Sequence, residues 1–388
     1  MKYKLEDLFD LQMGKTPARN NPEYWNSADN KWLSIGDLSK CGKYITNTKE
    51  YLSDTAVEES GISLIPENTV VMSFKLSIGK TAITSEPMYS NEAIMSFRDK
   101  RVVPILPDYL YYMFSAKDWD EGTNKAVMGK TLNKATLAKV TIDVHSPTEQ
   151  RKIVDTLDKV ASVIGARRQQ LSALDDLIKA RFVEMFGDPE FNTKSWSVQA
   201  LDNLCEVGSS KRIYQNEQSL EGIPFWRISD LITKMDTGVA DSGLFIPEGK
   251  YNELKDANLV PIVGDILVTS RGTLGRCYIV KEEDRFYFQD GMISWLSEFD
   301  RRITPLYLQH LFTMPGFRKQ IDSMQAGSTV AYLSIAMLKK LQVMVPSKDT
   351  QDRFAAFVAQ IDKSKSVIQK SLDETQLLFD SLMQQYFG

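Results

Sequence analysis

The chain has 388 residues, with 47 lysines and arginines against 51 acidic residues and a net charge of −4 at pH 7. At roughly 100–200 residues per domain, this length predicts two or three domains. No apolar run approaches the ~18 residues of a membrane span, and the first residues lack the apolar core of a secretory signal. The three cysteines are far apart and outside any CxxC pair. They exclude a disulfide framework and indicate a reducing, cytoplasmic location.

An internal repeat extends over nearly the whole chain, and its two copies are separated by about 200 residues. Six blocks recur in the same order, which chance similarity would not preserve. We therefore interpret the chain as a duplicated unit. The matched blocks include LEDLFDLQMGK (5–15) with LDNLCEVGSSK (201–211), WLSIGDL (32–38) with FWRISDL (225–231), VMSFKLSIGK (71–80) with VTSRGTLGR (268–276), PDYLYYMF (107–114) with PLYLQHLF (305–312), GKT (129–131) with GST (327–329), and SPTEQRKIV (146–154) with VPSKDTQDRFA (345–355).

The first part of each copy has the pattern of a mixed α/β domain. Short runs rich in β-branched and aromatic residues, separated by Gly, Pro, Asn and Asp, predict strands. These runs are TVVMSF (69–74), KTAIT (80–84) and AIMSF (93–97) in the first copy, and DILVTS (265–270), RCYIV (276–280) and MISWL (292–296) in the second.

Each copy ends in a segment that predicts one long helix, 147–187 in the first copy and 347–388 in the second. Pro147 followed by Thr-Glu-Gln, and Pro346 followed by Ser-Lys-Asp, are typical helix starts. A 3,4 spacing selects a heptad seam on each helix, and its apolar members are the predicted helix-pairing residues. They are Ile153, Leu157, Val160, Ile164, Leu171, Leu174 and Ile178, with Phe354, Val358, Ile361, Ile368, Leu372, Phe379 and Leu382.

The charged breaks of one seam fall on apolar positions of the other: Arg167 matches Ile368, and Lys365 matches Ile164. The two helices therefore suit each other better than copies of themselves. We expect an α+β protein in which two α/β domains in tandem are separated by two long helices, forming an antiparallel coiled coil with pseudo-two-fold symmetry. The expected segments are 1–146, 147–187, 188–346 and 347–388. Ordinary core helices of two separate domains are the alternative.

The motifs of common enzymes are absent. The sequence has no GxxxxGK[ST], no GxSxG and no HExxH, and its only histidines are His145 and His310. Asn21–Tyr24 and Asp188–Phe191 resemble the [DN]PP[YF] motif of amino-methyltransferases, but glutamate replaces the second proline and no glycine-rich cofactor loop lies nearby. We therefore predict no catalytic residue and no metal site in this chain.

Basic and small polar residues recur at equivalent places in glycine-containing loops of both copies. Surface lysines are common, but their recurrence in both halves points to a shared ligand surface. Arginine and lysine suit guanine edges and phosphates, and Ser or Thr suit phosphates, so we expect DNA contacts here. Asn133 and Gln325 lie nearby as candidates for adenine. The predicted DNA-binding residues are Lys15, Lys75, Lys80, Lys130, Thr131, Lys211, Arg212, Arg271, Arg276, Ser328 and Thr329.

The charge balance is uniform along the chain. Segments divided at residues 146, 190 and 346 each carry one more acidic than basic residue. No segment is therefore a general polyanion binder, and nucleic-acid contacts must come from local clusters or with the help of partner subunits.

The whole chain resembles a type I restriction-modification specificity subunit. The resemblance rests on the opening LEDLFDLQMGKTP, the [FW]-x-x-I-x-DL block, the helix starts TEQRKIVDTLDKV and TQDRFAAFVAQID, and the helix ends LDDLIKARFVEMFGDP and LDETQLLFDSLMQQYFG. It implies a non-catalytic subunit whose two target-recognition domains each read half of a bipartite, asymmetric site in double-stranded DNA, with the helices setting the gap. It also implies two modification subunits that carry S-adenosylmethionine, and restriction subunits that use ATP.

Other functions remain open at this point. A stand-alone two-domain regulator would bind specific DNA tightly without methyltransferase partners. An enzyme acting alone would bind a cofactor, and a structural adaptor would bind no specific DNA. The bases that are recognised, the spacer length and the presence of a restriction subunit do not follow from the sequence.

Overall fold

A computed structural model describes residues 1–388 except 76, 120–123, 127–128 and 326–330. The chain divides into unit 1 (Met1–Arg168 with Lys370–Gly388) and unit 2 (Gln169–Gln369). Each unit contains one α/β part and a segment of each long helix. The expected domain limits at residues 146, 187 and 346 stay a prediction.

The α/β part of unit 1 contains a five-stranded sheet in the order β2 (Phe9–Met13), β9 (Ile94–Asp99), β6 (Val70–Ser73), β7 (Thr81–Thr84) and β4 (Tyr44–Ile45). A second sheet has the order β5 (Glu50–Leu52), β3 (Asn30–Leu33) and β8 (Tyr89–Ser90). Two further pairs are β1 (Lys2–Lys4) with β12 (Thr141–Asp143), and β10 (Asn124–Ala126) with β11 (Gly129–Thr131). The helices are α1 (Leu5–Leu8), α2 (Pro22–Trp25), α3 (Ile35–Leu38), α4 (Asp54–Ser60), α5 (Pro107–Ala116) and α6 (Lys134–Ala138).

The α/β part of unit 2 contains a four-stranded sheet in the order β14 (Glu206–Gly208), β20 (Ile293–Ser297), β17 (Ile266–Thr269) and β18 (Cys277–Ile279). A second sheet has the order β16 (Phe245–Ile246), β15 (Ile223–Trp226) and β19 (Tyr287–Phe288), and β13 (Ser197–Ala200) pairs with β21 (Gln342–Val345). The helices are η1 (Leu201–Asn203), η2 (Gln215–Glu217), α8 (Ile228–Thr237), α9 (Glu248–Asp256), α10 (Pro305–Leu311), α11 (Pro315–Ser323) and α12 (Ile335–Lys340).

The sheets confirm the sequence repeat strand by strand. The order β2-β9-β6-β7 in unit 1 matches β14-β20-β17-β18 in unit 2, and β5-β3-β8 matches β16-β15-β19. Even the parallel pairs are equivalent, because Trp32 lies opposite Tyr89 in β3 and β8 while Phe225 lies opposite Tyr287 in β15 and β19. The matched strands of the two halves therefore have the same order, and unit 1 adds β4 at one edge of its larger sheet.

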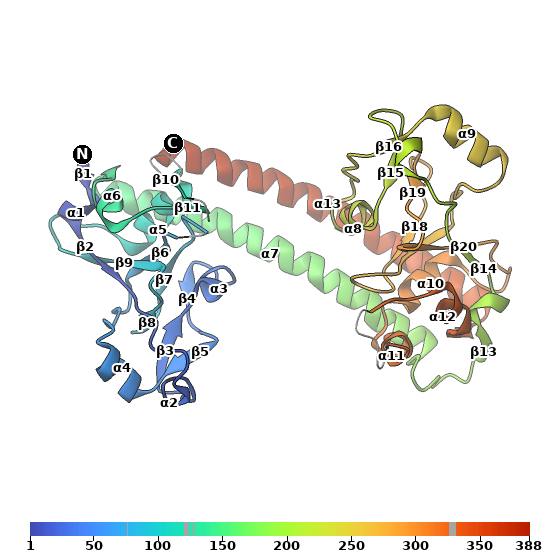
Figure 1. Ribbon diagram of the computed structural model, residues 1–388, viewed down its shortest axis with the longest axis horizontal. Coiled ribbons are helices and arrows are strands. Elements are labelled where there is room, and N and C mark those ends of the chain that lie inside the picture. The colour runs from blue at the N-terminus through green and yellow to red at the C-terminus, as the bar shows by residue number, and fades with distance from the viewer. Residues whose placement is uncertain (76, 120–123, 127–128, 326–330) are drawn as a thin grey trace. The chain divides into compact units, whose positions relative to one another are not determined.

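Both predicted long helices are present, as α7 (Pro147–Phe186) and α13 (Lys348–Phe387) (Figure 1). In unit 2, Asp175 of α7 pairs with Lys365 of α13, with 2.6 Å between Oδ1 and Nζ. Further along α7, the Phe182 ring lies 5.5 Å from the ring of Phe354. Residue numbers rise along one helix and fall along the other, so the two segments are antiparallel within this unit.

Each unit has its own hydrophobic core, to which the long helices contribute. In unit 1 the core joins β2, β6 and β9 to Ile153 and Leu157 of α7, with Phe379 and Leu382 of α13 packed against it. In unit 2 it joins β17 and α10 to Phe182 and Phe354. Among the described residues, no helix combines the length and apolar character that crossing a bilayer requires.

Candidate nucleic-acid interface

The turns that hold four of the predicted basic residues are built in the same way in both units. After β6, the Gly79 amide donates to Ser73 O (2.9 Å) and the Lys80 amide donates to Ser73 Oγ (3.2 Å). After β17, the Gly275 amide donates to Thr269 O (2.8 Å) and the Arg276 amide donates to Thr269 Oγ1 (3.0 Å). The matched positions are therefore equivalent in space: Lys75 with Arg271, and Lys80 with Arg276.

Glycine is required in these turns for its backbone conformation. Gly79 has φ +85° and Gly275 has φ +71°, in the left-handed region that side chains disfavour. A Cβ on Gly79 would also lie 2.7 Å from Cδ1 of Trp119. The glycine that the sequence repeat aligns is thus a determinant of turn shape.

A second basic segment lies along the turn in each unit. The Lys15 amide donates to Ser90 O (2.8 Å), and the Phe74 amide donates to Ala93 O (3.0 Å), so residues 90–93 lie between the Lys15 segment and the turn. In unit 2, Ser210 Oγ donates to Phe288 O (2.7 Å), and the Ser270 amide donates to Met292 O (2.9 Å). The structure therefore brings the Lys15 and Lys211 segments to the same side of their units as the turns.

A third segment reaches the same turns. The Leu132 amide donates to Phe74 O (3.1 Å), and the Leu333 amide donates to Ser270 O (3.0 Å). Lys130 and Thr131 belong to β11, immediately before Leu132, and only their backbone is described. The predicted Ser328 and Thr329 lie outside the described residues. Three segments far apart in the sequence thus converge in each unit.

The basic side chains of unit 2 differ in their partners. Arg276 Nη2 lies 2.6 Å from Asp236 Oδ1 and lowers the pKa of that carboxyl, and Arg212 Nε lies 2.9 Å from Asp290 Oδ2. Arg271 is exposed, and its guanidinium carbon lies 4.9 Å from the Tyr332 ring centre. In the part of the chain that the structure describes, Arg271 has no acidic partner, so its hydrogen-bonding groups are available to a ligand.

The predicted basic residues of unit 1 are all lysines. Lys15 Nζ donates to Ser60 O (2.6 Å), and the Lys75 ammonium lies 5.3 Å from the Phe74 ring centre, while Lys80 is exposed. Partial burial raises the pKa of Glu92, but a hydrogen bond from Thr16 and the charges of Lys75 and Arg19 outweigh it and hold that pKa below its usual value. This carboxylate is therefore ionised within the basic cluster at neutral pH.

The comparison with known proteins identifies the family. The family model described as the type I restriction modification DNA specificity domain matches residues 1–174 and 193–375. The chain belongs to this family. The type I restriction enzyme MjaIX specificity subunit of Methanocaldococcus jannaschii is 26% identical over 410 residues, which cover 98% of this chain and 90% of the relative.

Two solved structures share the fold of this specificity subunit, each at 14% identity. The S subunit of a type I restriction-modification system from M. genitalium has a TM-score of 0.54, with 100% of this chain and 96% of that chain covered. A chain from work on complex assembly and conformational transition of the type I R-M system has a TM-score of 0.57, with 100% and 97% covered. The expected recognition and fold class are thus confirmed.

The side chains of Asn133 and Gln325, which were proposed to bind adenine, are bonded to nearby backbone groups of this specificity subunit. Asn133 Oδ1 accepts from the Thr136 amide (2.8 Å) and caps α6. Gln325 binds both backbone groups of Tyr332, through Oε1 to N (2.8 Å) and through Nε2 to O (3.1 Å). Both side chains shape the loops, so the sequence-based hypothesis that they read adenine finds no support in their geometry.

The burial of the residues predicted to pair the helices agrees with an apolar seam, while their pairing stays a prediction. Each of the apolar seam residues is buried or half-buried. The sequence pattern missed Phe182 and Phe186, which are fully buried and pack with Tyr307 and Phe354 in unit 2. It also missed Gln150 and Gln351 as structural residues, although both stand at matched places in the two helix starts.

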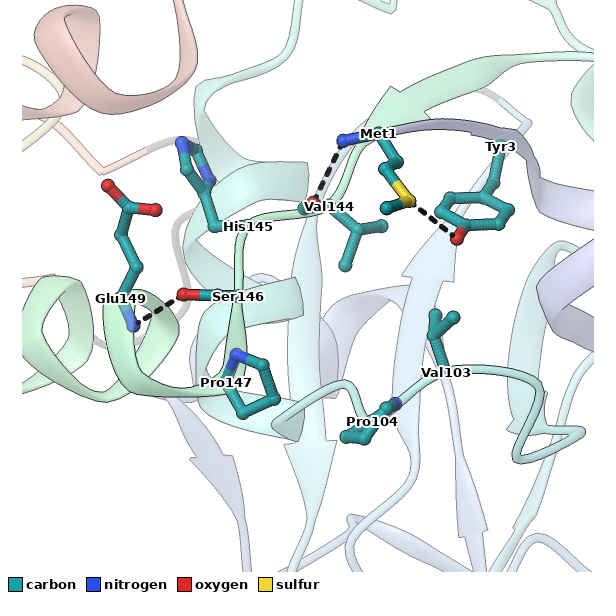
Figure 2. A pocket seen from close by; sticks show the side chains of 9 residues that line it. All are labelled: Met1, Tyr3, Val103, Pro104, Val144, His145, Ser146, Pro147 and Glu149. Carbon is teal, nitrogen blue, oxygen red and sulfur yellow. Dashed lines mark hydrogen bonds between the residues drawn. The ribbon is translucent and has the colours of Figure 1, made fainter.

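A pocket of about 490 Å³ lies at the start of α7 (Figure 2). Figure 2 shows Met1, whose amino group donates to Val144 O (3.1 Å), beside the His145 segment. His145 Nδ1 lies 2.6 Å from the Tyr109 hydroxyl. None of the predicted basic residues lines this pocket. Among the described residues, no group of three or more His, Cys, Asp and Glu side chains could hold a metal ion.

Proposed function

We propose that this specificity subunit reads an asymmetric, bipartite site in double-stranded DNA, with unit 1 reading one half and unit 2 the other. One observation carries the proposal: three separate segments converge in the same way in both units, around basic residues at equivalent positions. At the turn positions the side chains differ, because unit 1 has Lys75 and Lys80 where unit 2 has Arg271 and Arg276. Equivalent backbone segments that carry different basic side chains favour two different half-sites.

The partners of the basic residues support different roles within unit 2. Arginine binds guanine O6 and N7 with two parallel hydrogen bonds, which needs a free guanidinium edge. Arg271 has that freedom, whereas Arg276 and Arg212 already bind Asp236 and Asp290. We assign base reading to Arg271, and backbone positioning to Lys15, Lys75, Lys80 and Lys211, because lysine acts as a point charge towards phosphate.

The chemistry is assigned to partner subunits. Two modification subunits docked along α7 and α13 would supply S-adenosylmethionine and methyl transfer, and restriction subunits would supply the ATP-dependent nuclease. The absence of a P-loop from the sequence supports a non-catalytic role, as does the absence of a glycine-rich cofactor loop. The net charge of −4 supports a reader that depends on its partners for much of its affinity, since DNA binding is dominated by phosphate contacts.

Methylation mapping tests the proposal directly. Single-molecule sequencing of DNA from cells with and without this gene should reveal methylated adenines in a two-part site that disappears with the gene. Arg271→Ala should relax one position of the half-site read by unit 2, because a bidentate contact contributes roughly 1–3 kcal/mol of discrimination. Arg276→Ala should relax the same half less, since its guanidinium is shared with Asp236.

The control is Lys75→Ala, at the equivalent place in unit 1. It should leave the half-site read by unit 2 unchanged. If neither arginine variant changed either half, the assignment to unit 2 would be wrong. Tight specific binding by the isolated chain without methyltransferase subunits would instead favour a stand-alone regulator.

A further inference from the structure

Unit 2 contains a cavity of about 710 Å³ that the DNA-reading function does not use. Its walls come from α9, from the loop before β17, from the segment after β18, and from β20 and the residue that follows it. Ligand sites in proteins commonly have volumes of 300–1,000 Å³. The lining residues that matter are Tyr251, Ile262, Val263, Asp265, Trp295 and Glu298.

A buried carboxylate lines this cavity with one oxygen unused. Asp265 is 5% exposed, and its Oδ2 accepts from the Ile262 amide and from Trp295 Nε1, both at 2.9 Å. Among the described residues, Oδ1 has no hydrogen-bond partner and the carboxylate has no ion pair. Burial raises the pKa of Asp265. Oδ1 is therefore free to accept from a cationic ligand, and a cation beside a carboxylate stabilises its charged form.

A neighbouring carboxylate, Asp284, has partners for both of its oxygens. Asp284 also lines the cavity, but it pairs with Lys234 (3.1 Å) and accepts from the Tyr278 hydroxyl (2.6 Å) and the Lys281 amide (2.8 Å). Glu298, by contrast, is exposed and, in the described chain, has no ion pair. Two carboxylates of the cavity therefore lack a cationic partner. Of the lysines in the lining, Lys281 pairs with Glu283 (4.0 Å), and Lys255 pairs with neither Asp265 nor Glu298.

The repeat shows that the fold does not require these residues. The register places Ile266 opposite Leu296 in unit 2 and Val70 opposite Phe97 in unit 1. Thr69 and Ser96 therefore occupy in unit 1 the positions of Asp265 and Trp295. Because the same sheet forms with a threonine and a serine there, the carboxylate and the indole of unit 2 are additional to the fold.

The cavity also lies away from the candidate DNA surface. Strand β17 runs from Ile266, beside the cavity, to Thr269, where the basic turn begins. The rim carries two exposed apolar side chains, Ile262 (70% exposed) and Val263 (60% exposed). Free carboxylates would repel phosphates, whereas an apolar rim around a buried negative charge suits a protein segment.

We propose that this cavity binds the guanidinium group of an arginine side chain presented by a partner protein. A guanidinium donates to carboxylates and packs well against aromatic rings, and Asp265 and Trp295 both line the cavity. Ile262 and Val263 would cover the apolar stem or a neighbouring side chain. The site is independent of the reading of DNA bases.

Tryptophan indole signals in NMR spectra of the full-length protein test the cation site. The chain has six tryptophans, and Trp295→Phe assigns the signal of interest. Titration with ethylguanidinium should shift the Trp295 signal selectively, while ethylurea, its neutral analogue, should bind at least tenfold more weakly because it lacks the charge-assisted bond. Equal shifts with both probes, or none with ethylguanidinium, would overturn the proposal without any mutation.

Asp265→Asn is the matched variant, because its amide oxygen can still accept from Ile262 and Trp295 while the negative charge is lost. It should weaken ethylguanidinium binding about tenfold or more, whereas Glu282→Gln, an exposed acid outside the cavity lining, should not. Duplex DNA should not displace the probe; displacement would assign the cavity to the DNA surface and refute the site. Methylated sequences should be unchanged in Asp265→Asn, which separates this test from that of the proposed function.

The identity of the partner is tested in cells. A photo-cross-linking phenylalanine derivative in place of Ile262 should form an adduct with a peptide that contains arginine, and Asp265→Asn should reduce that adduct. The same derivative at Val239, which is 68% exposed elsewhere in unit 2, is the control. Adducts with DNA, or with peptides that lack arginine, would contradict the proposal.

Discussion

Two buried glutamines anchor the starts of the long helices. Gln150 accepts from the Leu106 amide (2.9 Å) and donates to the carbonyl groups of Pro104 and His145 (2.9 Å each). In unit 2, Gln351 is bonded in the same way, to the Thr304 amide (2.9 Å) and to the carbonyls of Arg302 (2.8 Å) and Pro346 (3.0 Å). One side chain thus satisfies three backbone groups that would otherwise be buried without partners. This explains the glutamine in the two matched helix starts.

Replacing this side chain by an apolar one tests its role. Gln351→Leu should lower the free energy of unfolding of unit 2 by about 3 kcal/mol or more, because each buried group left unsatisfied costs about 1–3 kcal/mol. Denaturant unfolding followed by tryptophan fluorescence measures the change. Gln360→Leu, at an exposed site of the same helix, should change stability by less than about 0.5 kcal/mol. Similar effects of the two variants would contradict the anchoring role.

At the scale of elements, the strands and long helices follow from local patterns. Short runs rich in β-branched and aromatic residues predicted β6, β7, β9, β17, β18 and β20. The helix starts and the long 3,4 pattern predicted α7 and α13 to within one residue at each end. The partners of the basic residues could not be predicted in this way. Asp236, which binds Arg276, lies near the end of α8, beyond the matched block 225–231, so only the tertiary fold brings the two together.

The packing of α10 on α13 makes unit 2 sensitive to pH. His310 of α10 lies edge-on to Phe354, with ring centres 5.2 Å apart. Burial, together with the charge of Lys365, lowers the pKa of His310 to about 4, although Asp175 raises it. In the unfolded chain histidine titrates near 6.5. The unfolded state therefore binds the proton first, so this contribution to stability is full above pH 6.5 and is lost as the pH falls towards 4.

A variant without a titrating group isolates this effect. The unfolding free energy of the wild type minus that of His310→Leu should fall by up to about 3 kcal/mol between pH 7 and pH 4, because only the wild type loses stability through this histidine. Denaturant titrations of both proteins at a series of pH values measure it. The carboxylates of the two proteins titrate alike and cancel in the difference. A difference that stays constant with pH would show that the pKa of His310 is the same in the folded and the unfolded chain.

At the scale of the whole molecule, the boundary between units 1 and 2 falls inside both long helices, after Arg168 in α7 and after Gln369 in α13. Polar contacts flank it: Arg168 with Gln376 in unit 1 (3.4 Å), and Asp175 with Lys365 in unit 2 (2.6 Å). The large aromatic residues that anchor the helices lie further towards their ends, in the unit cores. A central stretch can therefore be shortened without removing these aromatic residues, and Leu372, at 9% exposed, is the one buried hydrophobic residue among the described residues of the stretch removed below.

This arrangement allows a test of whether the two long helices set the gap between the half-sites. Deleting one heptad from each helix around the boundary, residues 166–172 and 367–373, keeps the seam in phase and shortens each helix by about 10 Å at ~1.5 Å per residue. At ~3.4 Å per base pair, the gap between half-sites should shrink by about three base pairs while both half-sites stay the same. Methylation mapping reads the new spacer. Deletion from one helix alone breaks the pairing of the seams and should abolish assembly. An unchanged spacer in a fully active double-deletion variant would show that the helices do not set the distance.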